Sequence, residues 1–140
     1  MAKQVFEVLT EAGSKKKKTD RVAVLRQNES WALKDVLRGT FDSTVQWILP
    51  EGEPPYTPSE VHNAPTSLLR ENTKFAYFAR GGKGKDLPKF KVERLYIGML
   101  EGIHPEDARA VINMVNKEPP KNITREIVQE AFPGLLRDAK

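Results

Sequence analysis

Apolar residues recur at helical spacing along most of this 140-residue chain. A stripe within residues 4–12 predicts a short helix that Gly13 ends. Thr19 is a suitable N-cap for a second helix, which Asn28 is expected to close. The first part of the chain should therefore form helices joined by short links.

A third helix is predicted to begin after Ser30, because serine accepts hydrogen bonds from first-turn N–H groups. Gly39 would be its left-handed C-cap residue. Its expected core face holds Trp31, Leu33, Val36 and Leu37. Residues 44–49 are β-branched and aromatic, which favours a strand, but no partner strand is evident, so strand and helical turn both remain open.

The helical pattern continues in the second half of the chain. A helix is predicted from Thr66 or Ser67 to about Arg80, and the next is expected to open at Asp86 and Pro88. The apolar face of that next helix comprises Phe90, Val92, Leu95, Tyr96, Met99 and Leu100. Further helices should start at His104, which precedes a proline, and after Thr124, an N-cap type.

Between these halves, residues 50–65 hold five prolines. Such a density excludes a regular helix or a central strand and predicts an extended surface segment. The sequence as a whole predicts an all-α fold, a compact bundle of five to seven short helices with room for one short β element. We expect a single domain over residues 1–140, in which residues 1–18 form an N-terminal helix and a basic arm.

Composition excludes several classes of protein. Hydrophobic residues make up 39% of the chain and charged residues 30%, which is ordinary for a small globular domain. The absence of cysteine excludes disulfides, iron–sulfur clusters and thiol nucleophiles. No apolar run approaches the roughly 20 residues of a membrane span, and the charged N terminus does not resemble a signal peptide. We therefore expect a cytoplasmic protein without a membrane partner.

Positive charge is concentrated in two stretches, residues 15–21 and 80–94, although the net charge is only +4. Each stretch leads into a predicted helix, so lysines and first-turn N–H groups together would favour phosphates. We predict that both fold onto one nucleic-acid-binding surface, with Tyr77 as a stacking residue. Its residues are Lys15, Lys16, Lys17, Lys18, Arg21, Tyr77, Arg80, Lys83, Lys85, Lys89, Lys91 and Arg94. A solvated linker is the alternative interpretation of the lysine run.

The proline-rich segment is a second candidate site. It is acidic, extended and aromatic, and a preformed extended chain loses little entropy when it binds a neighbouring subunit. The docking residues would be Glu51, Pro54, Pro55, Tyr56 and Pro58. The alternative is a connector that packs on its own domain, pinned by Tyr56.

Catalysis is not indicated. His62 and His104 are the only imidazoles, and no Asp or Glu lies at metal-ligand spacing from either. The glycine-rich loop at residues 81–85 lacks the spacing and the closing Lys-Ser/Thr of a nucleotide-binding loop. No nucleophile elbow is present. We therefore predict a non-enzymatic protein with no catalytic residue, no metal and no cofactor.

Three stretches resemble a known family. They are Ala32–Asp42, Leu49–Pro58, and Met99–Ala108 together with the closing Glu130–Leu136. They are similar to a family of small uncharacterised proteins of large contractile-tailed, myovirus-type bacteriophages, including cyanophages. The resemblance implies a setting in the host cytoplasm during infection or in the virion, and it assigns no catalytic residue.

We therefore expect a phage accessory protein that binds DNA, RNA or a nucleoprotein complex through its basic loops. The first alternative is a head, neck or tail component of the virion that docks to neighbouring phage subunits through the proline-rich segment. A second alternative is an inhibitor or modulator of a host protein.

Overall fold

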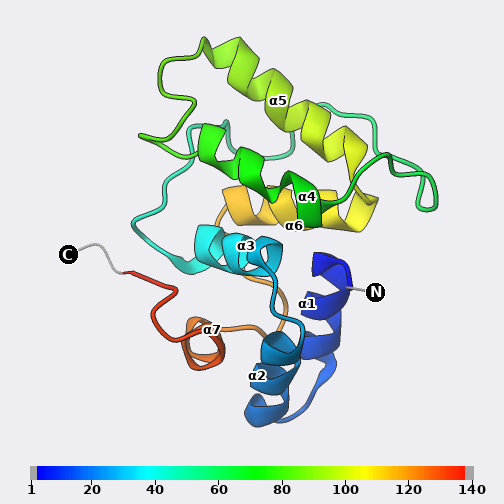
Figure 1. Cartoon of the computed structure of the whole chain (residues 1–140), viewed down its shortest axis with the longest axis vertical. Coiled ribbons are helices and arrows are strands. Elements are labelled where there is room, and N and C mark those ends of the chain that lie inside the picture. Colours follow the sequence, from blue (N-terminus) through cyan, green and yellow to red (C-terminus); the bar gives the residue numbers. More distant parts are fainter. Residues whose placement is uncertain (1–2, 138–140) are drawn as a thin grey trace.

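The computed structural model describes residues 3–137 and is built almost entirely from helices, without a sheet in that range (Figure 1). The elements are α1 (Val5–Ser14), α2 (Lys18–Gln27), α3 (Trp31–Phe41), α4 (Leu68–Glu71), the 3-10 helix η1 (Asn72–Tyr77), α5 (Lys89–Gly102), α6 (Pro105–Val115) and α7 (Arg125–Ala131). This architecture confirms the predicted all-α fold. The outermost residues of the predicted domain, 1–2 and 138–140, lie outside the described range.

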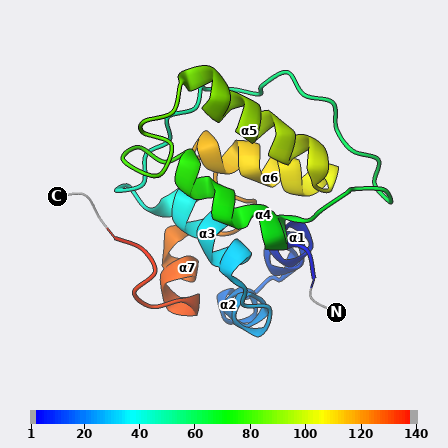
Figure 2. The same ribbon diagram turned by 45° about the horizontal axis from the view of Figure 1, so that its top comes forward.

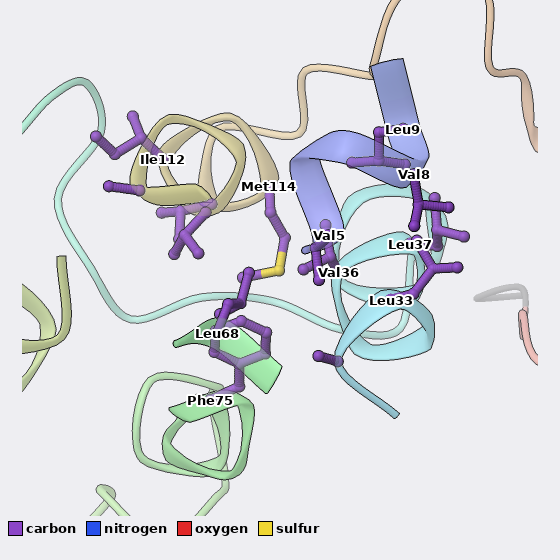
Figure 3. Packing of buried hydrophobic residues seen from close by; sticks show 14 of the residues in the cluster. Val5, Val8, Leu9, Leu33, Val36, Leu37, Leu68, Phe75, Ile112 and Met114 are labelled. Carbon is purple, nitrogen blue, oxygen red and sulfur yellow. The ribbon is translucent and has the colours of Figure 1, made fainter. Parts of the chain in front are cut away.

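Helix α6 organises the core, because it contacts α1, α3 and α5. Its Met114 is fully buried and lies close to Val5 of α1, Val36 of α3 and Leu68 of α4 (Figure 3). The buried apolar side chains form one cluster that includes residues of every helix. Burial of each large side chain contributes about 1.5–3 kcal/mol, so this shared cluster is what joins the short helices.

Side-chain caps confirm three of the predicted helix starts. The hydroxyl of Ser30 accepts a hydrogen bond from a first-turn N–H of α3 at 3.1 Å. The Nδ1 atom of His104 accepts one at the start of α6 at 3.0 Å, and the hydroxyl of Thr124 accepts one at the start of α7 at 3.3 Å. These caps satisfy N–H groups that would otherwise lack partners within the helix.

Two boundaries near the lysine run differ from the prediction. Helix α1 passes through Gly13 and ends at Ser14. Helix α2 begins at Lys18, so the prediction of Thr19 as its N-cap is wrong. The carbonyl oxygen of Lys17 accepts hydrogen bonds from the N–H groups of Asp20 and Arg21, and this backbone pattern starts the helix without a side-chain cap.

The roles predicted for Gly39 and Trp31 are also wrong. Gly39 lies inside α3 and is buried; a Cβ there would lie 2.5 Å from the Trp47 ring and 2.7 Å from the Met114 sulfur. The glycine is therefore required for close packing and not for a left-handed turn. The side chain of Trp31 is 75% exposed, because the core face of α3 begins with Ala32 and Leu33.

The helix predicted from Thr66 or Ser67 to about Arg80 is only partly α-helical. It runs as α4 and then continues as η1, which ends at Tyr77. Asn72 and Thr73 at the change have low helix propensity. The Asn72 side chain is turned to the core and donates a hydrogen bond to Asp35 of α3 at 2.6 Å.

Helix α5 begins later than predicted, at Lys89, with Pro88 in place of Asp86 as its N-cap residue. Its buried face holds Val92, Tyr96, Met99 and Leu100 as expected. Phe90 and Leu95 do not join this face; they are 59% and 36% exposed. The outer face of α5 therefore carries two large apolar side chains.

The segment at 44–49 is neither a strand of a sheet nor a helix. It contains one isolated antiparallel bridge between Trp47 and Ala79. The Ile48 N–H donates to the Phe78 carbonyl at 2.8 Å, and the Arg80 N–H donates to the Gln46 carbonyl at 2.7 Å. These bonds fix the point at which the chain leaves η1 for the basic loop.

A polar cluster closes the C-terminal end of α3. The Nζ atom of Lys117 donates to the carbonyl oxygens of Gly39, Asp42 and Val45 at 2.7, 3.1 and 2.6 Å. Burial lowers the pKa of Lys117, against the opposing charge of Asp42. A cation at this position is favourable because the last carbonyls of a helix carry partial negative charge.

The proline-rich segment packs on its own domain. Its extended chain passes along α5 and α6 (Figure 2), and Tyr56 is partly buried against the core, as predicted. The Gly52 N–H donates to Asn116 at 2.8 Å, and the Thr57 N–H donates to Glu101 at 2.8 Å. These bonds hold both ends of the strip formed by residues 51–58.

Candidate nucleic-acid interface

The basic loop at residues 79–88 is a series of tight turns. The Lys83 N–H donates to the Ala76 carbonyl at 2.8 Å, which ties the loop to the end of η1. A Cβ at Gly82 would collide with that same carbonyl oxygen, and one at Gly84 would collide with the carbonyl oxygen of Tyr77. The two glycines therefore permit close backbone contact, and the side chains of Lys83 and Lys85 remain exposed beside them.

All six cations predicted in this stretch are exposed. We refer to them as the basic end: Arg80, Lys83, Lys85, Lys89, Lys91 and Arg94. Within residues 3–137, none of the six forms an ion pair. Residues 80–94 contain only two acidic side chains, Asp86 and Glu93. The segment therefore presents a local excess of positive charge that the fold itself does not neutralise.

The start of α5 adds to this excess of positive charge. Pro88 provides no side-chain cap, so the first N–H groups of this 14-residue helix keep their partial positive charge. Lys89 and Lys91 lie in the same first turn. Anionic groups are thus favoured near this helix end both by side chains and by the backbone.

The exposed aromatic residue at the basic end is Phe90, so the prediction that it lies on the core face of α5 is wrong. Tyr77, the predicted stacking residue, is half-buried, and the Lys83 ammonium lies 5.9 Å from its ring centroid. Phe90 could have been found from the sequence, because it lies between Lys89 and Lys91 and four residues before Arg94. That pattern places it on a charged helix face.

The first basic stretch is partly used within the fold. The Lys18 ammonium pairs with Glu126 and with Glu130 of α7, at 2.9 Å from the latter. These hydrogen bonds raise the pKa of Lys18. The Arg21 guanidinium donates to the carbonyl of Lys15 at 2.8 Å. The remaining cations of the stretch, Lys15–Lys17, are exposed.

The two basic stretches do not converge. The connection between α1 and α2, which carries Lys15–Lys17, lies at one end of the long axis of the molecule, and α5 lies at the other (Figure 1). The view in Figure 2 separates them in the same way. The expectation of one continuous basic surface is therefore wrong, and the basic end must be considered alone.

The predicted docking residues lie along the strip of residues 51–58. Glu51, Pro55 and Pro58 are exposed, whereas Pro54 and Tyr56 are half-buried. Glu53 forms an ion pair with Arg109 of α6. A pocket of about 230 Å³ lies between the strip and α5, with Glu93, Tyr96 and Ile97 in its wall. The strip thus has the packing expected of a connector, and it retains an exposed outer edge.

The two histidines line one small pocket of about 190 Å³, together with Gln4, Thr66 and Ser67. His104 is already used as the cap of α6, and its ring stacks on Phe6 at a centroid distance of 4.3 Å.

No group of three or more His, Asp or Glu side chains that could hold a metal occurs in the part of the chain that the structure describes. Likewise, none of its helices is both long and apolar enough to cross a membrane.

Comparison with protein families gives a match over most of the chain. A family of unknown function, DUF6433, matches residues 8–121, which is most of the chain. The chain belongs to this family. A comparison with curated proteins found no match. The matched range of the DUF6433 protein runs from α1 to the loop after α6, so it includes both basic stretches and the proline-rich strip.

Proposed function

We propose that this DUF6433 protein is a non-enzymatic phage accessory protein that binds nucleic acid, or a nucleoprotein complex, through the basic end. The observation that carries the proposal is the set of six exposed cations that form no ion pair within residues 3–137, held by a glycine-dependent loop and the start of α5. The phage setting is supported by the sequence resemblance described above. Host cytoplasm during infection is the corresponding location.

Charge neutralisation tests this proposal. The variant K83Q/K85Q/K89Q removes three cations of the basic end, and K15Q/K16Q/K17Q removes three exposed cations at the opposite end. Both variants have the same net charge, so the second is a matched control. Binding to a short labelled oligonucleotide would be measured by fluorescence anisotropy across a salt series.

We expect the basic-end variant to lose affinity at least tenfold, and the slope of log affinity against log salt to fall by about 2 to 3. The control variant should bind within about twofold of wild type. Equal losses in both variants would mean that net charge alone, and not the basic end, governs binding. No binding by wild type at low salt would refute the function itself.

The second candidate is a virion component that docks to neighbouring subunits through the strip of residues 51–58. The separation of the two basic stretches favours it, because an architectural protein needs no continuous basic surface. Mass spectrometry of purified particles would discriminate between the two proposals. A stoichiometric copy number in the virion favours docking, and presence only in infected lysate favours nucleic-acid binding.

A further inference from the structure

We infer that the basic end binds single-stranded rather than duplex nucleic acid, with Phe90 as the platform on which an unpaired base stacks. This inference rests on the proposed function and gives its substrate class. Its starting observation is the position of Phe90, the second residue of α5, whose side chain is 59% exposed among the cations.

The exposure of Phe90 is part of a continuous outer helix face. Residues four apart along an α-helix lie on the same face. In α5 the pairs Phe90–Arg94 and Lys91–Leu95 have this spacing, and all four residues are exposed. An apolar ring and two cations are thus presented together, which distinguishes Phe90 from a singly scattered surface residue.

The ring of Phe90 makes no ring contact within residues 3–137, unlike those of Trp31 and Tyr77. The Trp31 ring has the Lys34 ammonium 4.8 Å from its centroid, and the Tyr77 ring has Lys83 at 5.9 Å. Among residues 3–137, Phe90 takes part in no ring stacking and no cation–π contact. Its ring faces are therefore available to a ligand.

The chemistry of the ligand follows from this combination. Cations contact phosphates in single strands and duplexes alike, so they do not discriminate between the two. A base offers its flat face to an aromatic side chain only when it is not stacked within a duplex. An exposed phenyl ring flanked by Lys89 and Lys91 therefore matches a strand whose backbone follows the cations while one base stacks on Phe90.

The test uses the full-length protein and the variants F90A, F90W and L95A. Leu95 is the matched control, since it is an exposed apolar residue on the same face of α5. The probes are a labelled oligothymidylate of about a dozen nucleotides, within the usual site size, and a duplex of the same length. Anisotropy titrations would be run at several salt concentrations, and thermal unfolding would verify that each variant folds.

We expect wild type to prefer the single strand, and F90A to weaken single-strand binding by about 5- to 100-fold. The salt slope should not change, because the cations remain. F90W should retain wild-type affinity, and L95A should lie within about twofold of it. A preference for duplex, or an F90A effect that is absent or equal on both probes, would overturn the inference. The proposed function would survive these results; in this experiment it is refuted by failure of wild type to bind either probe at low salt.

Discussion

Asp107 is a carboxyl group held without solvent contact in the first turn of α6. One oxygen accepts a hydrogen bond from the Phe6 N–H at 2.8 Å, which ties α1 to α6. The other oxygen has no hydrogen-bond partner within residues 3–137. Burial raises the pKa of Asp107 to about 6, against the Phe6 hydrogen bond and with a further contribution from the charges of Glu7 and Glu106.

This pKa gives a pH-dependent stability with a defined sign. In the folded state Asp107 holds its proton up to about pH 6, whereas in the unfolded chain it releases it near pH 4. The folded state therefore binds more protons in this window, and stability decreases as pH rises from about 4 to about 6. D107N keeps an oxygen acceptor for Phe6 and removes the buried charge. We expect it to gain up to about 3 kcal/mol over wild type at pH 7 and little at pH 4.

Urea denaturation between about pH 4 and pH 8 would measure this difference. Glu106 is a suitable control, because it is exposed in the same helical turn. E106Q should shift the pH profile of stability only slightly. Parallel profiles for wild type and D107N would show that Asp107 does not titrate in the window given.

At the scale of elements, the sequence was sufficient to predict a helix start where that start depends only on neighbouring residues. The side chains of Ser30, His104 and Thr124 cap the helices they were predicted to cap, because N-capping depends on residues within one turn. Gly39 and Trp31 were misassigned because their environments depend on distant residues. Periodicity alone does not reveal that Trp47 and Met114 approach the backbone of α3 at Gly39.

The basic end illustrates the same limit within the candidate site. Its cations could be identified from the sequence, since charge clusters are visible as residue types. The apolar pattern wrongly grouped Phe90 with Val92 and Tyr96, although its position four residues before Arg94 indicated an exposed helix face. In the lysine run, which cations remain free depends on contacts with distant residues. The ion pair of Lys18 with Glu130 is one such contact, and it could not be predicted from the local sequence.

The attachment of the proline-rich strip can be tested through Glu101, whose side chain accepts the Thr57 N–H at 2.8 Å. E101A removes this acceptor, and E101Q keeps one. We expect cleavage within residues 50–65 by a non-specific protease to become several-fold faster in E101A and to stay at the wild-type rate in E101Q. Because Glu101 is exposed, the free energy of unfolding should fall by no more than about 1 kcal/mol.

Mass spectrometry of the fragments would locate the cleavage sites. If E101A and wild type are cleaved equally fast, the Thr57–Glu101 hydrogen bond does not hold the strip. Faster cleavage throughout the chain would instead indicate global destabilisation, which the denaturation measurement would detect independently.

At the scale of the whole molecule, the two basic stretches lie at opposite ends of the long axis (Figure 1). The basic end carries six exposed cations, and Lys15–Lys17 form a smaller exposed group at the other end. Ion pairing removes Lys18 from that smaller group. Because the two groups lie at opposite ends of the long axis, each can contact a different strand when screening is weak.

This geometry predicts that the protein bridges two strands at low ionic strength. Wild type, immobilised strand and a separate fluorescent strand would be mixed, and the captured fluorescence measured against salt. We expect capture at low salt and its loss near physiological salt, where the Debye length falls to about 8 Å. K15Q/K16Q/K17Q should abolish capture while leaving affinity for a single short strand nearly unchanged. Capture that persists in this variant would place the second contact elsewhere on the molecule, and a parallel loss of short-strand affinity would contradict the separation of the two ends.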